Sequence, residues 1–317
     1  MLSRVAEHLY WLSRYVERAE ATARLATAAF DTILDLPTTI PYDWESLMLV
    51  FDPESELGDV GEAEVMRLLM VDRHNASSIR SSIAYARENA RVTRDLIPKD
   101  AWVCLNELHG LVERQSLSTL DRSARSRLLR QVIAGCRLWH GCLMSNMARD
   151  LGWAFLQLGD RIEHVDMLSR MIDPRVTQMA PSGSAQWASY EALGWQNVLT
   201  AIGGYELYRH STRNRLHGES ILQFVLRDRQ FPQSMTASLI QILADLAVLP
   251  HERVNAKLVQ GLIAGLDGLA LDRMTPDTLT ESMDWVQQGL SELHTQISAS
   301  YFYFIDDAGS STALTLS

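Results

Sequence analysis

Two segments of the sequence carry acidic and basic side chains at matching positions, where they could bind charged ligands or transfer protons. LSRYVERAEATARL runs from Leu12 to Leu25, and LGDRIEHVDMLSRM runs from Leu158 to Met171. A single offset of 146 residues relates the acids and the arginines, which are Glu17 and Glu163, Glu20 and Asp166, and Arg24 and Arg170. A constant offset without a gap predicts two related helical halves.

On a helical wheel these charged residues follow one edge of an apolar stripe. The stripe of the first segment contains Leu9, Leu12 and Val16. If water covers this edge, each acid forms an ordinary i,i+4 surface pair with arginine, worth about 0.2–0.5 kcal/mol. If another helix covers it, the pairs are buried and line a polar cavity. The acids that could then act as proton donors or acceptors are Glu17, Glu20, Glu163 and Asp166.

A third charged cluster lies in SIAYARENARVTRDL. Arg87, Arg91 and Arg94 recur at helical spacing beside Glu88 and Asn89. Guanidinium groups in such a ridge bind carboxylates or phosphates. We expect the ridge to pair with the acids of the repeated segments, and a ligand could bind where that pairing is incomplete.

Helical periodicity dominates between the nine prolines, and no alternating strand pattern is present, so the class is all-α, a multi-helix bundle. The sequence predicts one domain over 1–305, with halves of about 1–135 and 136–305, and a disordered tail over 306–317. The long loops are expected at 37–61 and 173–184. Helices are expected at 2–36, 62–72, 76–97, 99–115, 119–172 with a break near Gly135 or Gly141, 185–213, 218–228, 233–248, 251–270 and 277–304.

Composition and charge exclude several classes of protein. The net charge of −10 argues against general nucleic-acid binding. Three cysteines without a CxxC spacing indicate no disulfide framework. No signal peptide and no apolar stretch long enough to span a membrane is present, so we expect a cytoplasmic protein.

Searches for known catalytic motifs give no nucleotide-binding glycine loop and no GxSxG nucleophile elbow. A two-metal carboxylate site would need Glu-x-x-His pairs on two helices, and these are missing. We therefore expect no bound metal and no cofactor. A carboxylate-bridged metalloprotein remains the most remote alternative. Gly203 and Gly204, inside a helical pattern before Tyr205, indicate a close helix crossing or a ligand approach.

Five segments resemble the bacterial alpha-E family, an α-helical domain with a Glu-Arg motif. They are LYWLSRYVERAEATARL, SIAYARENARVTRDLIPKDAWVCLN, DLGWAFLQLGDRIEHVDMLSRM, WQNVLTAIGGYELYRH and ILQFVLRDRQFPQSM. The motif is Glu17-Arg18, whereas the second copy has Glu163-His164. The resemblance implies partnership with a circularly permuted ATP-grasp protein, and in many cases with a transglutaminase-like protein, in a system that forms amide bonds.

The leading hypothesis is an auxiliary component of such a system, which binds a partner or a peptide-like substrate in a polar cavity. The alternative is a stand-alone enzyme that uses buried carboxylates on an amino-acid-derived substrate, and assembly into a homo-oligomer is left open. The candidate binding residues are Arg14, Glu17, Arg18, Glu20, Arg24, Arg87, Glu88, Asn89, Arg91, Arg94, Glu163, Asp166, Arg170 and Tyr205.

Overall fold

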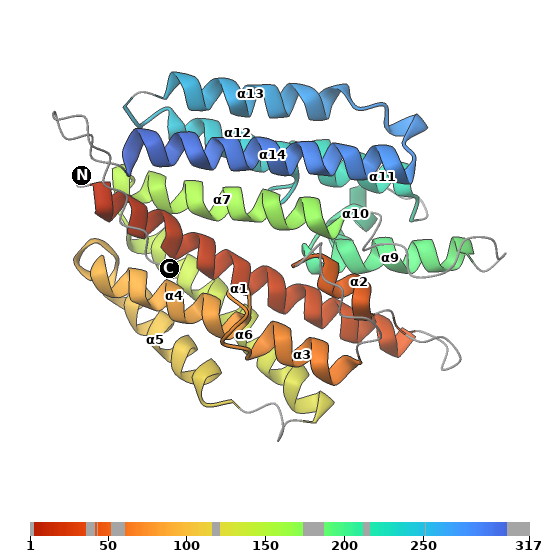
Figure 1. Ribbon diagram of the computed structural model, residues 1–317, viewed down its shortest axis with the longest axis horizontal. Helices are drawn as coiled ribbons and strands as arrows, with labels where there is room; N and C mark the ends of the chain where they lie inside the picture. The colour runs from red at the N-terminus through yellow and green to blue at the C-terminus, as the bar shows by residue number, and fades with distance from the viewer. Residues whose placement is uncertain are drawn as a thin grey trace.

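The computed structural model describes residues 3–35, 42, 44–51, 61–115, 121–173, 187–211, 216–250 and 252–302. Within these ranges all regular structure is helical, which confirms the all-α class (Figure 1). Most of the loops expected at 37–61 and 173–184, and the tail expected at 306–317, lie outside the described residues.

The N-terminal group of helices is built on α1, Ser3–Asp35, which packs against α4 and α6. Its other members are α2 (Trp44–Leu49), α3 (Glu62–Met70), α4 (Ile79–Val92), a 3₁₀ turn (Arg94–Leu96), α5 (Lys99–Glu113) and α6 (Arg122–Asn146). Ser78 caps α4 and Asp121 caps α6, each accepting a hydrogen bond from a backbone N–H of the first turn. Helix α5 covers the outside of α4 and α6.

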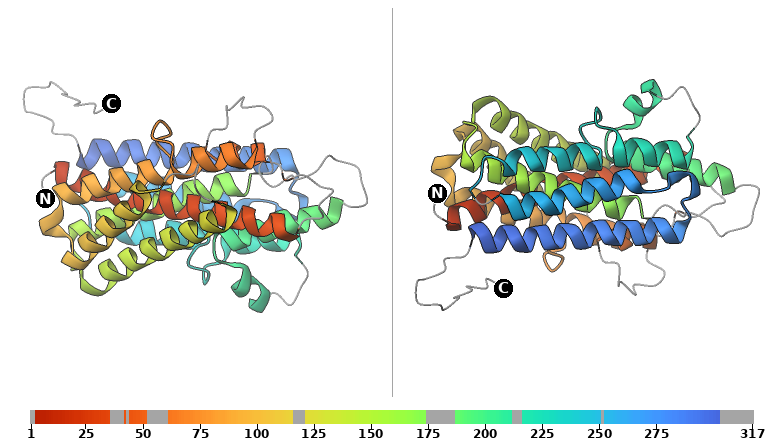
Figure 2. Two further views of the ribbon diagram at one scale, coloured as in Figure 1. Left: turned by 90° about the horizontal axis from the view of Figure 1, so that it is seen from below. Right: turned by 90° about the horizontal axis from the view of Figure 1, so that it is seen from above.

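The C-terminal group is built in the same way on α7, Leu151–Met171, which packs against α12 and α14. The remaining members are α9 (Trp187–Ala201), α10 (Tyr205–Ser211), α11 (Gly218–Leu222) with a π-helical turn (Gln223–Arg227), α12 (Met235–Leu246), α13 (Arg253–Gly268), a 3₁₀ turn (Leu271–Arg273) and α14 (Pro276–Tyr301). Helix α13 packs outside α12 and α14, in the place that α5 takes in the first group (Figure 2).

The two groups meet along α1 and α7, which form the most extensive helix–helix contact of the described residues. The helices run side by side in the same direction, because Ser13 donates to the carbonyl of Leu156 while Arg18, further along α1, reaches Glu163, further along α7 (Figure 1). Gly159 permits this approach. A Cβ atom there would lie 2.1 Å from the carbonyl oxygen of Tyr10.

A second repeated detail supports the relation between the two groups. The Ser78 hydroxyl donates to the carbonyl of Asp72. The Ser234 hydroxyl, at the start of α12, donates to the carbonyl of Asp228. The segments DRHNASS and DRQFPQS carry this arrangement in the sequence, a signal that sequence reasoning missed. We propose that the groups are two related halves. The predicted boundary near 135 falls inside α6, so the first half would extend to Asn146.

Two expected helices have different bounds. The break predicted near Gly135 or Gly141 lies instead at Met147–Asp150, where Met147 is extended and Asp150 caps α7. Gly135 serves packing, since a Cβ atom there would lie 2.9 Å from Leu108. The continuous helix predicted over 185–213 is also wrong, because α9 ends at Ala201.

The Gly203–Gly204 pair separates α9 from α10. Gly203 has φ of +68°, a left-handed conformation that favours glycine. A Cβ atom at Gly203 would lie 2.9 Å from Nη1 of Arg24. The glycine thus lies beside the Arg24 side chain where α9 has ended, rather than inside a continuous helix as the sequence pattern suggested.

Candidate functional site

The α1–α7 contact contains a buried cluster of charges around Glu163. Glu163 is fully buried, and its carboxylate accepts hydrogen bonds from Nε of Arg14 at 2.7 Å and Nε of Arg18 at 2.5 Å. Burial alone would raise the pKa of Glu163, but the two guanidinium groups lower it to about 2. Glu163 is therefore an anion held between two cations, which makes it unsuitable as a proton donor near neutral pH.

Glu17, the equivalent acid of α1, pairs instead with a histidine. Nδ1 of His164 lies 3.0 Å from Oε1 of Glu17, and Nε2 lies 2.9 Å from the carbonyl oxygen of Gln233. A carbonyl and an ionised carboxylate can only accept, so we expect both ring nitrogens of His164 to carry hydrogen. Burial opposes its charge, yet the hydrogen bond to Glu17 raises the pKa of His164, while that of Glu17 is lowered.

The charged residues of the two repeated segments therefore pair with each other across the α1–α7 contact, which we call the seam. The residue after each Glu, Arg18 in one segment and His164 in the other, forms an ion pair with the Glu of the opposite segment. The second segment lacks the arginine of the Glu-Arg motif, and His164 takes its place opposite Glu17. The position that departs from the motif in sequence therefore still contacts the Glu of the opposite segment.

A cavity of about 340 Å³ opens on the His164 side of the seam. Three carboxylates and three guanidinium groups face it, together with two histidines and apolar side chains. Its lining residues are Glu17, Glu20, Ala21, Arg24, Arg137, His140, Leu143, Met144, Trp153, Gln157, Asp160, Arg161, His164, Met167, Leu168, Met171, Ala201, Ile202 and Gln233. Of the candidates chosen from sequence, Glu17, Glu20 and Arg24 line this cavity.

Glu20 lies at the junction of α1 and α6. Its carboxylate accepts hydrogen bonds from Nε and Nη2 of Arg24, at 2.8 and 2.5 Å, and lies 3.6 Å from Nε of Arg137. Burial, and next the charge of Glu17, raise the pKa of Glu20 above its usual value. Arg137 is 61% exposed, so it stands at the mouth of the cavity rather than inside it.

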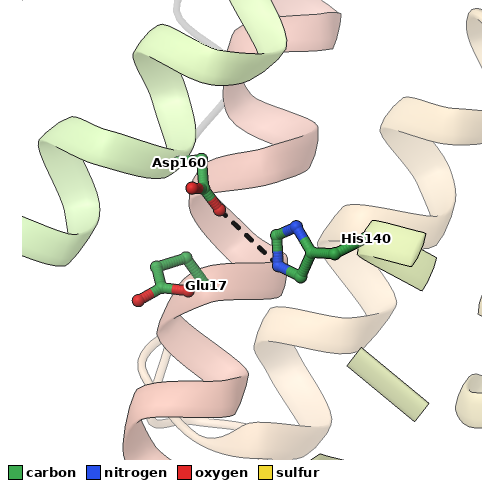
Figure 3. Close-up of side chains that lie close together, drawn as sticks. All are labelled: Glu17, His140 and Asp160. Carbon is green, nitrogen blue, oxygen red and sulfur yellow. Dashed lines mark ion pairs between the residues drawn. The ribbon is translucent and has the colours of Figure 1, made fainter. Parts of the chain in front are cut away.

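Asp160 and His140 lie close together in the lining of the cavity (Figure 3). Nε2 of His140 lies 3.6 Å from Oδ1 of Asp160 and 3.9 Å from Oε2 of Glu20. Asp160 is only 7% exposed, and its Oδ1 atom accepts no hydrogen bond from the described residues. Burial is the main cause that raises the pKa of Asp160. Near it, burial raises the pKa of Asp245 to about 7.

The remaining acid–arginine pair of the repeat lies outside the cavity. Nε of Arg170 donates to Asp166 at 3.1 Å, in the i,i+4 pair that the sequence predicts. Burial raises the pKa of Asp166 despite this contact. Tyr205 is half-buried against the hydrophobic core and is absent from the cavity lining.

The arginine ridge of α4 does not pair with the acids of the repeat, so that expectation is wrong. Arg87 donates to Asn106, and Arg91 pairs with the exposed Glu88. The guanidinium of Arg94 stacks on Trp102, as does that of Arg87. Asn89 shares a hydrogen bond with His8. Arg87 and Arg94 thus face Trp102 of α5 and Arg91 is exposed, while the buried face of α4 contains Ile79, Ile83, Ala86 and Ala90.

Sequence reasoning missed His140, Asp160, Arg161, Arg137 and Gln233. His140 and Arg137 belong to α6, which carries no repeated acid and gave no signal. The sequence did contain a signal for Asp160, because it occupies the position of Arg14 in the aligned repeat. This reversal of charge distinguishes the side of the seam at Glu163, which is closed, from the side at Glu17, which opens on the cavity.

The fold and the site define an all-α protein whose two central helices enclose a charged cavity. The chain belongs to the alpha-E family, described as a predicted alpha-helical domain with a conserved ER motif, whose model matches residues 1–302. Uncharacterised proteins of Mycobacterium bovis and Mycobacterium tuberculosis are each 26% identical to it over 321 residues.

The match covers 94% of this chain and 35% of each of these relatives, so the chain spans about a third of their length. In those proteins the alpha-E region is joined to further polypeptide. No solved structure matches the chain. Among the described residues, no helix combines the length and the apolar character that crossing a membrane requires.

Proposed function

We propose that this chain is the ligand-binding component of an amide-ligation system, and that the cavity beside α1 and α7 receives a small amino-acid-like or peptide-like molecule. The cavity itself carries the proposal. Its 340 Å³ lies within the size range of small-molecule sites, about 300–1,000 Å³.

The charges of the cavity match a ligand that has both an amine and a carboxylate. Carboxylates bind ammonium groups and guanidinium groups bind carboxylates, in both cases through charge-assisted hydrogen bonds. Arg137 at the mouth is free to bend toward a ligand, since it is largely exposed and lies 3.6 Å from its acid. Apolar contacts from Trp153, Leu143 and Met167 are available for the remainder of the ligand.

The partner in this proposal is the circularly permuted ATP-grasp protein that family resemblance implies, with a transglutaminase-like protein as a further member. The chain has no nucleotide-binding motif of its own, so ATP-dependent activation of a carboxylate would take place on the partner. In the mycobacterial relatives the matching region is part of a chain almost three times as long, so further polypeptide is joined to it there.

Binding in the cavity can be tested by calorimetric titration of the full chain with a panel of amino acids and dipeptides. Arg137→Gln should weaken binding of a carboxylate-bearing ligand at least about 10-fold, because one charge-assisted hydrogen bond is lost. Arg130→Gln, two turns earlier on α6 with its side chain bonded to Ser126, is the matched control. Equal affinity in both variants would contradict a ligand site at the mouth.

The amide-ligation role needs a separate experiment with the ATP-grasp protein. We expect the two proteins to copurify, and the ligated product to form faster when the alpha-E chain is present. Arg137→Gln should reduce this stimulation, and Arg130→Gln should not. If product formation is the same with and without the chain, the auxiliary role is wrong even when the cavity binds a ligand.

A second candidate function is catalysis by the chain itself. Its support is that Asp160 and Glu20, whose pKa values burial raises, both lie in the cavity beside His140. Raised pKa values in a cavity are typical of general acids. Turnover of a substrate by the isolated protein, abolished by Asp160→Asn while the fold is kept, would favour this function over an auxiliary one.

A further inference from the structure

We propose that Glu17, His140 and Asp160 bind a divalent transition-metal ion in the cavity. Each residue offers one ligand atom, and these three atoms lie within 4.8 Å of one another (Figure 3). The proposal depends on this geometry and not on which organic ligand the cavity receives.

The three ligand atoms would need to move only slightly to bind one ion. Two ligand atoms bound at about 2.1 Å from one ion in a tetrahedral site are separated by roughly 3.4 Å. Oδ1 of Asp160 and Nε2 of His140 are already 3.6 Å apart. The remaining separations, none above 4.8 Å, can close through a change of side-chain torsion at His140 or Glu17, since neither side chain is completely buried.

Asp160 provides an independent indication of a missing partner. It is only 7% exposed, yet its Oδ1 atom faces His140 without accepting a hydrogen bond from the described residues. Its other oxygen faces Arg161, with Oδ2 3.7 Å from Nε. A buried carboxylate oxygen that accepts no hydrogen bond is costly in a folded protein. A metal ion between Asp160, His140 and Glu17 would satisfy it.

His164 and Gln233 give Glu17 the support that metal-binding carboxylates commonly have. Nδ1 of His164 lies 3.0 Å from Oε1 of Glu17, and Nε2 lies 2.9 Å from the carbonyl oxygen of Gln233, which holds the ring in place. Residues that bond to a metal ligand in this way orient it and strengthen metal binding. Glu20, 3.9 Å from Nε2 of His140, is placed as a further carboxylate beside the site.

One imidazole and two carboxylates favour a borderline or hard divalent ion such as Zn²⁺ or Mn²⁺ over Cu⁺, which prefers sulfur. The sequence predicted no metal because the Glu-x-x-His pair was absent. The tertiary structure brings the histidine from α6 and the two acids from α1 and α7, so no short motif could show the site.

The test is a titration of the full-length chain, freed of metal with a chelator, with Zn²⁺ and separately with Mn²⁺ and no organic ligand. Calorimetry gives the affinity and elemental analysis gives the stoichiometry. We expect one ion per chain. Asp160→Asn and His140→Gln should each weaken binding at least about 100-fold, because loss of a direct ligand should cost no less than loss of its supporting residue.

Asp267→Asn on α13 and His109→Gln on α5 are the matched controls, and both should bind as tightly as the wild-type protein. Circular dichroism shows whether each variant is folded. Asp160→Asn keeps the side-chain volume, so it remains informative if His140→Gln fails to fold. The d–d absorption of Co²⁺ bound to the wild-type chain reports coordination without any variant.

Absence of saturable binding of both metals to the wild-type chain would overturn the proposal. So would equal affinity in the folded Asp160→Asn variant and its control. Because no organic ligand is present, neither result bears on the amide-ligation role. Conversely, failure of the ligation assay leaves the metal titration unchanged.

Discussion

At the scale of single residues, the two equivalent acids of the repeat have opposite surroundings. Glu163 is enclosed by Arg14 and Arg18, whereas Glu17 faces the cavity and touches His164. The decisive difference lies one helical turn before each acid, where α1 has Arg14 and α7 has Asp160. The arginine adds a second cation to Glu163 and closes one side of the seam. The aspartate adds negative charge and leaves the other side open to a ligand.

Replacing the enclosed acid should destabilise the protein strongly. Glu163→Gln leaves two guanidinium groups buried without an anion, and loss of one partner from such a cluster costs about 3–5 kcal/mol. Urea unfolding at pH 7 measures this change. Glu88→Gln, which removes the exposed pair with Arg91, is the control. This variant should stay within about 0.5 kcal/mol of wild type.

The same variant has a defined pH dependence. The folded pKa of Glu163, about 2, lies below its ordinary value of 4.5. Its contribution is therefore complete above pH 4.5 and is lost as the pH falls through 2. The difference in free energy of unfolding between wild type and Glu163→Gln should shrink across this interval. A constant difference down to pH 2 would contradict the buried ion cluster.

The His164–Glu17 pair predicts a second pH effect with the opposite sign. The folded pKa of His164 is raised, so its contribution is present below the ordinary value of 6.5 and is lost as the pH rises through the folded pKa. Wild type should lose stability above pH 6.5 relative to His164→Gln, which lacks this titration. Urea unfolding from about pH 6 to pH 9 measures both curves, and parallel curves would show that the pKa of His164 is the same in the folded and unfolded states.

At the scale of elements, the close approach of α1 and α7 positions every charged contact of the site. Gly159 is the point at which it is most sensitive, since a Cβ atom would meet the Tyr10 carbonyl oxygen at 2.1 Å and Oγ of Ser13 at 2.7 Å. The backbone of α1 cannot move aside as a flexible side chain could. The helices must separate to admit a methyl group, and Glu163 would then lose its short contacts with Arg14 and Arg18.

Gly159→Ala should consequently lower the free energy of unfolding by about 2–3 kcal/mol through overpacking. Gly261→Ala is the matched control, because a Cβ atom added to this glycine of α13 would have no neighbouring atom within 4 Å. Alanine has the higher helix propensity, so Gly261→Ala should stabilise the protein by about 0.5–1 kcal/mol. Thermal and urea unfolding compare the two variants. A neutral Gly159→Ala would contradict the tight crossing.

At the scale of the whole molecule, the corresponding contacts of α1 with α4 and α6, and of α7 with α12 and α14, support two related halves. Each half contributes one central helix, and part of the buried face of that helix is covered only by the other half. Neither central helix is fully covered by the helices of its own half, because α1 and α7 share the largest contact. We expect the halves to be interdependent rather than separate folding domains.

Fragments 1–148 and 149–317, divided between α6 and α7, test this interdependence. Coexpressed fragments should copurify as a 1:1 complex with the helical content of the intact chain. Each fragment expressed alone should be aggregated or poorly folded, because its side of the α1–α7 contact would expose apolar surface to water. Analytical ultracentrifugation and circular dichroism distinguish these states. Two stable, non-associating monomers would contradict the expectation.

Local periodicity was sufficient for much of the fold. Helices α4, α5, α12, α13 and α14 lie within or very close to the expected ranges, because their apolar positions recur with the helical repeat and Ser, Asp or Pro residues mark most of their starts. The helix ends at Met147–Asp150 and at Gly203–Gly204 were harder to predict from the sequence. Gly135 lies within α6, where the absence of a Cβ atom leaves room for the Leu108 side chain. No local sequence pattern distinguishes a glycine that permits packing from one that ends a helix.

The sequence by itself determined that the chain is all-helical and that Glu17, Glu20 and Arg24 on one helix have counterparts on another, because these features depend on spacing along a single helix. Only the tertiary structure decided that Glu163 is closed off by two arginines while Glu17 opens on a cavity. It alone added His140 from α6 and Gln233 from the start of α12. Electrostatic interactions act through space over a few ångströms, so partners distant in sequence decide which of two similar acids is neutralised and which can meet a ligand.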